Sequence, residues 1–211
     1  MKPFRLTSKF YFIFCVVFTA PASWVSSGLI FWIEKLPHEN YLYKIYSFGL
    51  FEAPTTLLIL LLFFWLFNVY LWKLPLIKKL VGIPNVNGRY EGFLTSSYDK
   101  EKTKYPTVIE IKQSLTSIKV NLYTQRSGSY NLIANICRNN NENHELVYVY
   151  QNRTSAPAPD DDMRDHTGTA LLAILNRGSE LNGNYFNNPR ERGRHGNINV
   201  KRTTSKIEGK F

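Results

Sequence analysis

The stretch IEIKQSLTSIKVNLYT, residues 109–124, decides the fold of the C-terminal part of the chain. Every second residue in it is apolar, first before and then after a short polar turn. These apolar residues are Ile109, Ile111, Ile118, Val120 and Leu122. Because successive side chains of a β-strand point to opposite faces, this period of two predicts two half-buried strands, near 106–113 and 117–124.

The same alternation continues on both sides of this stretch. It predicts further strands near 88–96, 128–138, 144–152, 167–175, 180–187 and 195–202. Turn-forming pairs such as Ser127-Gly128 and Arg177-Gly178 separate the strands, and no helix-length amphipathic run interrupts them. Eight short strands in sequence predict a small eight-stranded antiparallel β-barrel over residues 84–211, because closure into a barrel removes exposed strand edges.

The N-terminal part of the chain has a different composition. Residues 10–33 and 53–72 contain no Lys, Arg, Asp or Glu, and these runs of 24 and 20 residues are long enough to cross a bilayer as helices. We therefore expect two transmembrane helices, about 10–33 and 53–74, in an N-terminal domain over residues 1–83. The predicted fold class is a membrane-anchored all-β protein.

Basic residues gather before the first span and after the second. They are Lys2, Arg5, Lys9, Lys73, Lys78 and Lys79. Positively charged flanks favour the cytoplasmic side, so both termini and the barrel are expected there, with a short external loop between the spans. A cleaved signal peptide ending near Ala20-Pro21-Ala22 is an alternative, but the uncharged run continues to Ile33, which is long for such a peptide.

The charge of the chain is unevenly distributed. The whole sequence has 26 basic and 16 acidic residues, a net charge of +10, and residues 73–211 hold 21 of the basic and 13 of the acidic ones. A basic domain attracts anions such as phosphates, nucleotides or lipid headgroups. A generic basic surface that faces an anionic membrane is the alternative interpretation.

The sequence offers little that indicates catalysis. It contains no nucleophile elbow, Walker loop, zincin motif or Rossmann fingerprint, and its histidines lie on separate segments. The acidic run Asp160-Asp161-Asp162 lies in a Pro-rich loop and is typical of a solvated segment. Cys15 and Cys137 are expected to be buried, reduced thiols. We expect a binding protein, not an enzyme, without a metal or cofactor.

Polar and aromatic residues lie toward the ends of the predicted strands. Tyr148, Tyr150 and Asn152 share one strand face, Thr124 and Arg126 close an earlier strand, and others follow later in the chain. The candidate ligand-binding residues are Thr124, Arg126, Tyr148, Tyr150, Asn152, Thr169, Tyr185 and Arg190. Stacking rings, hydroxyls, amides and guanidinium groups are what a phosphate-bearing nucleotide requires. Tyrosines packed in the core and arginines in a solvated loop fit the same pattern.

Short motifs recur in a characteristic order along the chain. Two spans are followed by GRYEG (88–92), IEIKQ (109–113) with TSI (116–118), LVYVYQN (146–152), HTGTA (166–170), LNGNYF (181–186) and a basic segment over 190–196. In this order the chain resembles the SMODS-associating two-transmembrane, β-strand-rich effectors of bacterial cyclic-oligonucleotide anti-phage signalling (CBASS). It departs from that pattern at Tyr90, where a tryptophan is expected.

The resemblance implies a receptor in the bacterial inner membrane. A partner nucleotidyltransferase (CD-NTase) makes a cyclic dinucleotide, the barrel binds it, and protomers self-associate. The spans then disrupt the lipid bilayer, which arrests growth or kills the cell. In this scheme the tyrosines stack on bases, Asn152 and Thr169 bond base edges or ribose, and Arg126 or Arg190 contacts phosphate. No nucleic acid polymer is expected as a partner.

Two other classes of protein compete with this interpretation. A membrane-anchored, lipocalin-like carrier of a lipid or other small hydrophobic ligand requires an apolar lumen, and the Arg, Tyr and Asn content disfavours it. A membrane-bound hydrolase requires a convergent acid, base or metal set, which the sequence does not show.

Overall fold

A computed structural model of the chain describes residues 2–3, 8–47, 52–139, 143–154, 165–188 and 193–211. The chain divides into two compact units, Arg5–Trp72 and Lys73–Phe211, and the latter includes Met1–Phe4. From the sequence we expect the barrel domain to begin at residue 84. This domain boundary stays a prediction.

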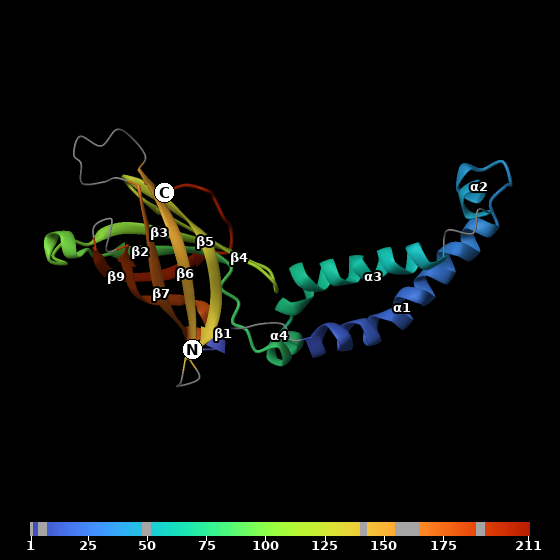
Figure 1. Cartoon of the computed structure of the whole chain (residues 1–211), viewed down its shortest axis with the longest axis horizontal. Coiled ribbons are helices and arrows are strands. Elements are labelled where there is room, and N and C mark those ends of the chain that lie inside the picture. Colours follow the sequence, from blue (N-terminus) through green and yellow to red (C-terminus); the bar gives the residue numbers. More distant parts are fainter. Residues whose placement is uncertain (1, 4–7, 48–51, 140–142, 155–164, 189–192) are drawn as a thin grey trace. The chain divides into compact units, whose positions relative to one another are not determined.

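The second unit is a closed barrel of eight antiparallel strands (Figure 1). The strands are β2 (Gly88–Leu94), β3 (Tyr105–Gln113), β4 (Ile118–Thr124), β5 (Ser127–Arg138), β6 (His144–Thr154), β7 (His166–Leu175), β8 (Glu180–Asn187) and β9 (His195–Thr204). Each strand pairs with the next in sequence, and β9 pairs with β2 to close the circle. This confirms the predicted eight-stranded barrel.

Short elements accompany the barrel strands. They are β1 (Lys2–Pro3), which pairs with the end of β5, the helix α4 (Pro75–Val81), and the 3-10 turns η2 (Ser97–Asp99) and η4 (Asn176–Gly178).

The core of the barrel follows the same alternation that predicted the strands. On β6, Leu146, Tyr148 and Tyr150 are buried and their sequence neighbours are half-buried, since one strand face lines the lumen.

One end of the barrel is sealed by residues 83–87, which lead from α4 into β2. Ile83 and Val86 are buried there. The Gln113 side chain, at the end of β3, accepts a hydrogen bond from the Val86 amide (2.8 Å), and the Arg202 guanidinium donates to the Asn85 carbonyl (2.7 Å). Gly82 reaches β6, where its carbonyl lies 3.0 Å from His144 Nε2. This end is therefore filled by the protein's own backbone and polar side chains.

A buried carboxylate holds the C-terminal segment against the outside of β2 and β3. Glu110 is 2% exposed, although it alternates away from the lumen. Its oxygens accept hydrogen bonds from the amides of Glu208 (2.8 Å) and Gly209 (2.9 Å), and Arg89 donates to it at 3.0 Å. Removing one partner of a buried charge leaves that charge without a hydrogen bond, which costs free energy. The Glu110 contact therefore keeps the C-terminal segment over β2 and β3.

We predict that Glu110→Gln lowers the free energy of unfolding of the barrel by about 2 kcal/mol, because it removes a buried charge that Arg89 and two amides share. The matched control is Glu91→Gln, whose side chain also pairs with Arg89 but is 46% exposed. The control change is expected to stay below about 1 kcal/mol. Thermal unfolding followed by the strand signal in circular dichroism measures both. Equal effects would contradict the prediction.

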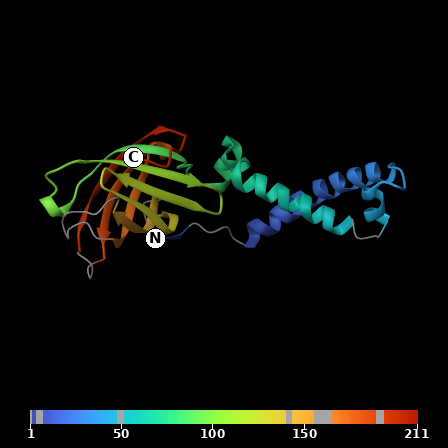
Figure 2. The ribbon, with the colours of Figure 1, turned by 90° about the horizontal axis from the view of Figure 1, so that it is seen from above.

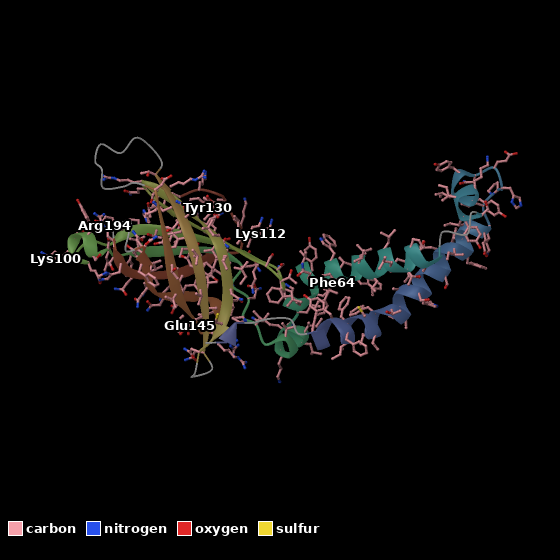
Figure 3. The ribbon with its side chains drawn as sticks, in the orientation of Figure 1. Phe64, Lys100, Lys112, Tyr130, Glu145 and Arg194 are labelled. Carbon is pink, nitrogen blue, oxygen red and sulfur yellow. The ribbon has the colours of Figure 1, made fainter. Side chains whose placement is uncertain are left out.

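The first unit consists of α1 (Ser8–Glu34), α2 (Tyr41–Ser47) and α3 (Glu52–Val69), and the 3-10 turn η1 (Leu71–Lys73) follows α3. The two long helices contact each other, and they cross in the view of Figure 2. Phe14 of α1 packs edge-on against Phe64 and Phe67 of α3, at ring separations of 5.4 and 5.5 Å. Figure 3 labels Phe64 in this cluster.

The outer surface of the helix pair is apolar. Phe12, Trp24 and Trp32 are 70%, 80% and 75% exposed. A helix pair in water would not leave such surface uncovered, whereas lipid chains cover it at no cost. Phe10–Glu34 and Pro54–Lys73 are long and apolar enough to cross a membrane, as predicted. Cys15 is exposed on α1, contrary to the expectation of two buried thiols, because it belongs to this outer surface; Cys137 is buried.

Candidate functional site

The end of the barrel opposite residues 83–87 is lined by polar side chains. Its residues, which we call the polar end, are Thr107, Thr124, Ser127, Ser129, Asn152 and Asn187. All except Thr124 are less than a tenth exposed. They come from the start of β3 and β5 and from the end of β4, β6 and β8, which meet at one mouth in an antiparallel barrel. Burial of so many polar groups is unusual unless something satisfies them.

Two tyrosines occupy the lumen below this mouth. Tyr148 and Tyr150 lie on β6 with ring centroids 6.1 Å apart, and the Tyr150 hydroxyl donates to Asn187 Oδ1 at 2.7 Å. Burial raises the pKa of both phenols well above the usual range. Both hydroxyls therefore stay protonated at physiological pH and act as neutral hydrogen-bond donors.

Small residues on β7 make room for these rings. Tyr150 pairs across the sheet with Gly168, and Tyr148 pairs with Ala170. A Cβ atom at residue 168 would overlap the Tyr150 phenol and lie 2.7 Å from the Phe186 carbonyl oxygen. Glycine is needed here for close approach, so the position of Tyr150 depends on its neighbour.

Several polar groups at this end have unused hydrogen-bonding capacity. The Tyr148 hydroxyl is buried without a partner among the described residues. Ser129 and Asn152 face each other across β5 and β6, and within the described part of the chain neither side chain makes a hydrogen bond. Unsatisfied buried polar groups cost about 1–3 kcal/mol each. A polar ligand that reaches them recovers this cost.

The rim of the mouth carries a cation. Arg126 lies exposed in the turn between β4 and β5, and its amide donates to the Thr124 hydroxyl at 3.4 Å. The Thr124 and Ser127 hydroxyls lie 3.0 Å apart and fix the shape of this turn. Among the described residues the Arg126 guanidinium makes no hydrogen bond or ion pair, so it is available to an anion.

The remaining predicted site residues differ in their placement. Tyr185 lies on the inner face of β8, but its hydroxyl donates to the Thr95 carbonyl at 3.1 Å and ties β8 to the end of β2. Thr169 lies on the outer face of β7, because the inward positions of this strand are Gly168, Ala170 and Leu172. The structure thus does not bring Thr169 to the lumen. Arg190 and Asp160-Asp161-Asp162 lie outside the described residues.

Sequence reasoning missed Asn187 as the partner of Tyr150. The signal was present, since Leu181, Gly183, Tyr185 and Asn187 follow the period of two on β8. No group of three His, Cys, Asp or Glu side chains that could hold a metal ion occurs among the described residues. The groups gathered at the polar end are hydroxyls, amides and one rim guanidinium, which bind by hydrogen bonds and charge.

We predict that Gly168→Ala destabilises the barrel by about 1–3 kcal/mol, because the added methyl group displaces the Tyr150 phenol and breaks its bond to Asn187. Thr169→Ala is the matched control on the next residue, with an expected change within about 0.5 kcal/mol because its side chain faces outward. Thermal unfolding by circular dichroism compares the two. A Gly168→Ala barrel as stable as the control would contradict this packing.

Residues 81–202 match the family described as Cap15, cyclic dinucleotide receptor domain. The chain belongs to this family. The matched segment begins at the last residue of α4 and ends in β9, so it contains the whole polar end of the barrel and neither long helix. The resemblance to CBASS receptors is therefore confirmed at the level of the receptor domain.

A relative named CD-NTase-associated protein 15, from Escherichia albertii, is 30% identical over 113 residues. This similarity covers 52% of the present chain and 57% of that protein. The chain thus matches little more than half the length of this relative of the Cap15 family. Cap15 receptor domains are a ligand-binding family, which agrees with the hydrogen-bonding groups at the polar end.

Proposed function

We propose that this protein is a membrane-anchored CBASS effector whose barrel binds a cyclic dinucleotide at the polar end. The ligand comes from a partner nucleotidyltransferase of the CD-NTase class. Binding causes protomers to self-associate, and the spans then disrupt the inner membrane, which arrests growth or kills the cell. The family description and the relative's name, which refers to a CD-NTase, support this proposal.

The observation that carries the proposal is the set of buried polar groups with unused hydrogen bonds. The Tyr148 hydroxyl and the Ser129 and Asn152 side chains provide donors and acceptors in a place with little water. Base edges and ribose hydroxyls present the complementary groups. Since the lumen is largely filled by the tyrosine rings, the ligand contacts the mouth and does not fill the barrel.

Charge favours the same ligand class. Residues 73–211 carry more basic than acidic residues, 21 against 13, and Arg126 stands free at the rim. A guanidinium forms paired hydrogen bonds with phosphate oxygens, and a cyclic dinucleotide has two phosphates. An apolar ligand would leave Ser129, Asn152 and Asn187 without partners, which disfavours the lipid-carrier alternative.

We predict that Arg126→Ala weakens binding of a cyclic dinucleotide roughly tenfold to a hundredfold, because one charge-assisted contact is worth about 1.5–3 kcal/mol. The matched control is Lys112→Ala, another exposed cation, on the outside of β3 (Figure 3). Its loss should change the affinity less than about twofold. Calorimetry with cyclic di-GMP, cyclic di-AMP, cyclic GMP–AMP and cyclic di-UMP measures both, with melting temperatures taken alongside.

Two outcomes would count against this site. If Arg126→Ala and Lys112→Ala lose affinity equally, the ligand responds to the overall charge of the barrel. If Tyr150→Phe and Asn152→Ala fold normally and bind as tightly as the unchanged chain, the ligand does not contact the polar end.

The proposal places the barrel in the cytoplasm. Lys78 and Lys79 follow the second span, and basic residues also precede the first, which is the arrangement that retains both termini inside. The enzyme that makes the ligand would then share a compartment with its receptor. Orientation is thus a separate condition that the proposed function must meet.

We predict that alkaline phosphatase fused after Phe211 is inactive in cells, because the fusion stays in the cytoplasm, where its disulfides do not form. The same reporter inserted between Glu39 and Asn40, in the loop between the spans, should be active. A green fluorescent protein fusion at each point provides the opposite readout. Active phosphatase after Phe211 would place the barrel outside and contradict the proposal.

A further inference from the structure

The loop that joins β2 to β3, residues 95–104, is held in one conformation. Lys100 and Glu101 both have a positive φ, 58° and 60°, which residues other than glycine rarely adopt. Hydrogen bonds to β9 maintain this backbone: the Thr95 amide donates to the Asn197 carbonyl (2.9 Å), and the Asn197 side chain donates to the Glu101 carboxylate (2.9 Å). Such strain costs about 1–3 kcal/mol per residue and persists only where the surroundings impose it. The loop is therefore a fixed part of the barrel surface.

This loop presents an aromatic ring to solvent. Tyr98 is 59% exposed, and the Arg194 guanidinium, from the connection between β8 and β9, lies 4.4 Å from the centre of its ring. The Ser97 hydroxyl accepts a hydrogen bond from the His195 amide (3.1 Å), which fixes the two connections to each other. Figure 3 shows Arg194 and Lys100 at the same end of the barrel. The cation–π contact orients the ring, and much of the ring stays accessible to a flat ligand.

The β2–β3 loop belongs to the same mouth as the polar end. In this antiparallel barrel the connections β2–β3, β4–β5 and β8–β9 lie at one end, and the turn that carries Arg126 is the next connection around the mouth. Tyr185 links the loop to the lumen, since its hydroxyl donates to the Thr95 carbonyl at 3.1 Å. Burial chiefly raises the pKa of Tyr185, the charge of Arg194 partly opposes this, and Tyr185 adds to the rise in pKa that burial causes at Tyr150. Tyr185 thus lies close to both residues, and the loop adjoins the tyrosines of the lumen.

We propose that Tyr98 and Arg194 form a second subsite of the ligand site, at which Tyr98 stacks on one base of a bound cyclic dinucleotide. Arg194 holds the ring in place and adds positive charge beside the phosphates. The face of a tyrosine ring carries no hydrogen-bonding group, so it accepts any base. The other base is then the one that Ser129 and Asn152 recognise through hydrogen bonds. The inference deepens the proposed function and rests on its binding step.

Calorimetry on the full chain in detergent micelles, with cyclic di-GMP, cyclic di-AMP, cyclic GMP–AMP and cyclic di-UMP, tests this subsite. We expect Tyr98→Ala to weaken the binding of each ligand that the unchanged chain binds, roughly fivefold to a hundredfold, because one base stack is lost. Tyr98→Phe keeps the ring, so its affinity should stay within about twofold. Tyr98→Leu keeps apolar bulk without a flat ring and should bind as weakly as Tyr98→Ala, which provides a second test if the alanine variant is unstable.

A second pair of tyrosine and arginine provides the matched controls. The Arg153 guanidinium lies 5.4 Å from the centre of the Tyr130 ring on the outside of β5 (Figure 3), so Tyr130→Ala should change the affinity less than about twofold. Arg194→Gln should weaken binding about fivefold and reduce the loss of affinity at high salt, because ions screen a phosphate contact. Arg153→Gln should change neither. A purely structural role of Arg194 would alter the melting temperature without altering the salt dependence, and would contradict its place in the subsite.

Variants at the two subsites separate this inference from the proposed function. If Arg126→Ala or Asn152→Ala weakens binding while Tyr98→Ala and Tyr130→Ala both fold and leave the affinity unchanged, the polar end binds the ligand alone and the second subsite is overturned. Equal losses from Tyr98→Ala and Tyr98→Phe would also overturn it, since the ring would then not stack. If the unchanged chain binds none of the four ligands, the proposed function fails at its binding step and this inference fails with it.

Discussion

An eight-stranded barrel has room inside for little more than its own side chains, and this limit governs the rest of the receptor unit. Tyr148 and Tyr150 fit the lumen only because the residues opposite them on the neighbouring strand, Gly168 and Ala170, are small. With the lumen filled and one end sealed by residues 83–87, contact with a ligand is confined to the other end. The position of the site thus follows from packing as much as from chemistry.

The regular part of this fold was predictable because it is local. Alternating hydrophobicity specified the strands and, through their number and order, a closed barrel, and the uncharged runs specified two long helices. The same period correctly put Tyr148, Tyr150 and Asn152 on one face. It did not fix the inward face of β7, because Gly168 and Ala170 are too small to stand out as core residues. Thr169, a candidate because it lies in a later strand of the same sheet, therefore faces outward.

Other features depend on contacts between distant parts of the chain. Glu110 alternates like an exposed strand residue, and only the return of Glu208 and Gly209 from the C-terminal segment buries it. Likewise, the period of two places Asn187 on the inner face of β8, but it does not show that Asn187 meets Tyr150. A hydrophobicity pattern predicts which face of a strand or helix is buried. It does not predict that a polar residue is buried, because that depends on a hydrogen-bond partner from a distant part of the chain.

The two units pose the same physical problem in different solvents. Among the described residues, the Tyr148 hydroxyl in the barrel and the Ser26 hydroxyl in the helix pair are both buried without a hydrogen-bond partner. Hydrogen bonds between membrane helices are individually weak, about 0.6 kcal/mol, so the helix pairs alone should associate little. In the proposed mechanism ligand binding gathers the barrels, which raises the local concentration of spans. Weak span contacts then suffice, and they also keep the resting protein dispersed, because a stronger interface would disrupt the membrane without any ligand.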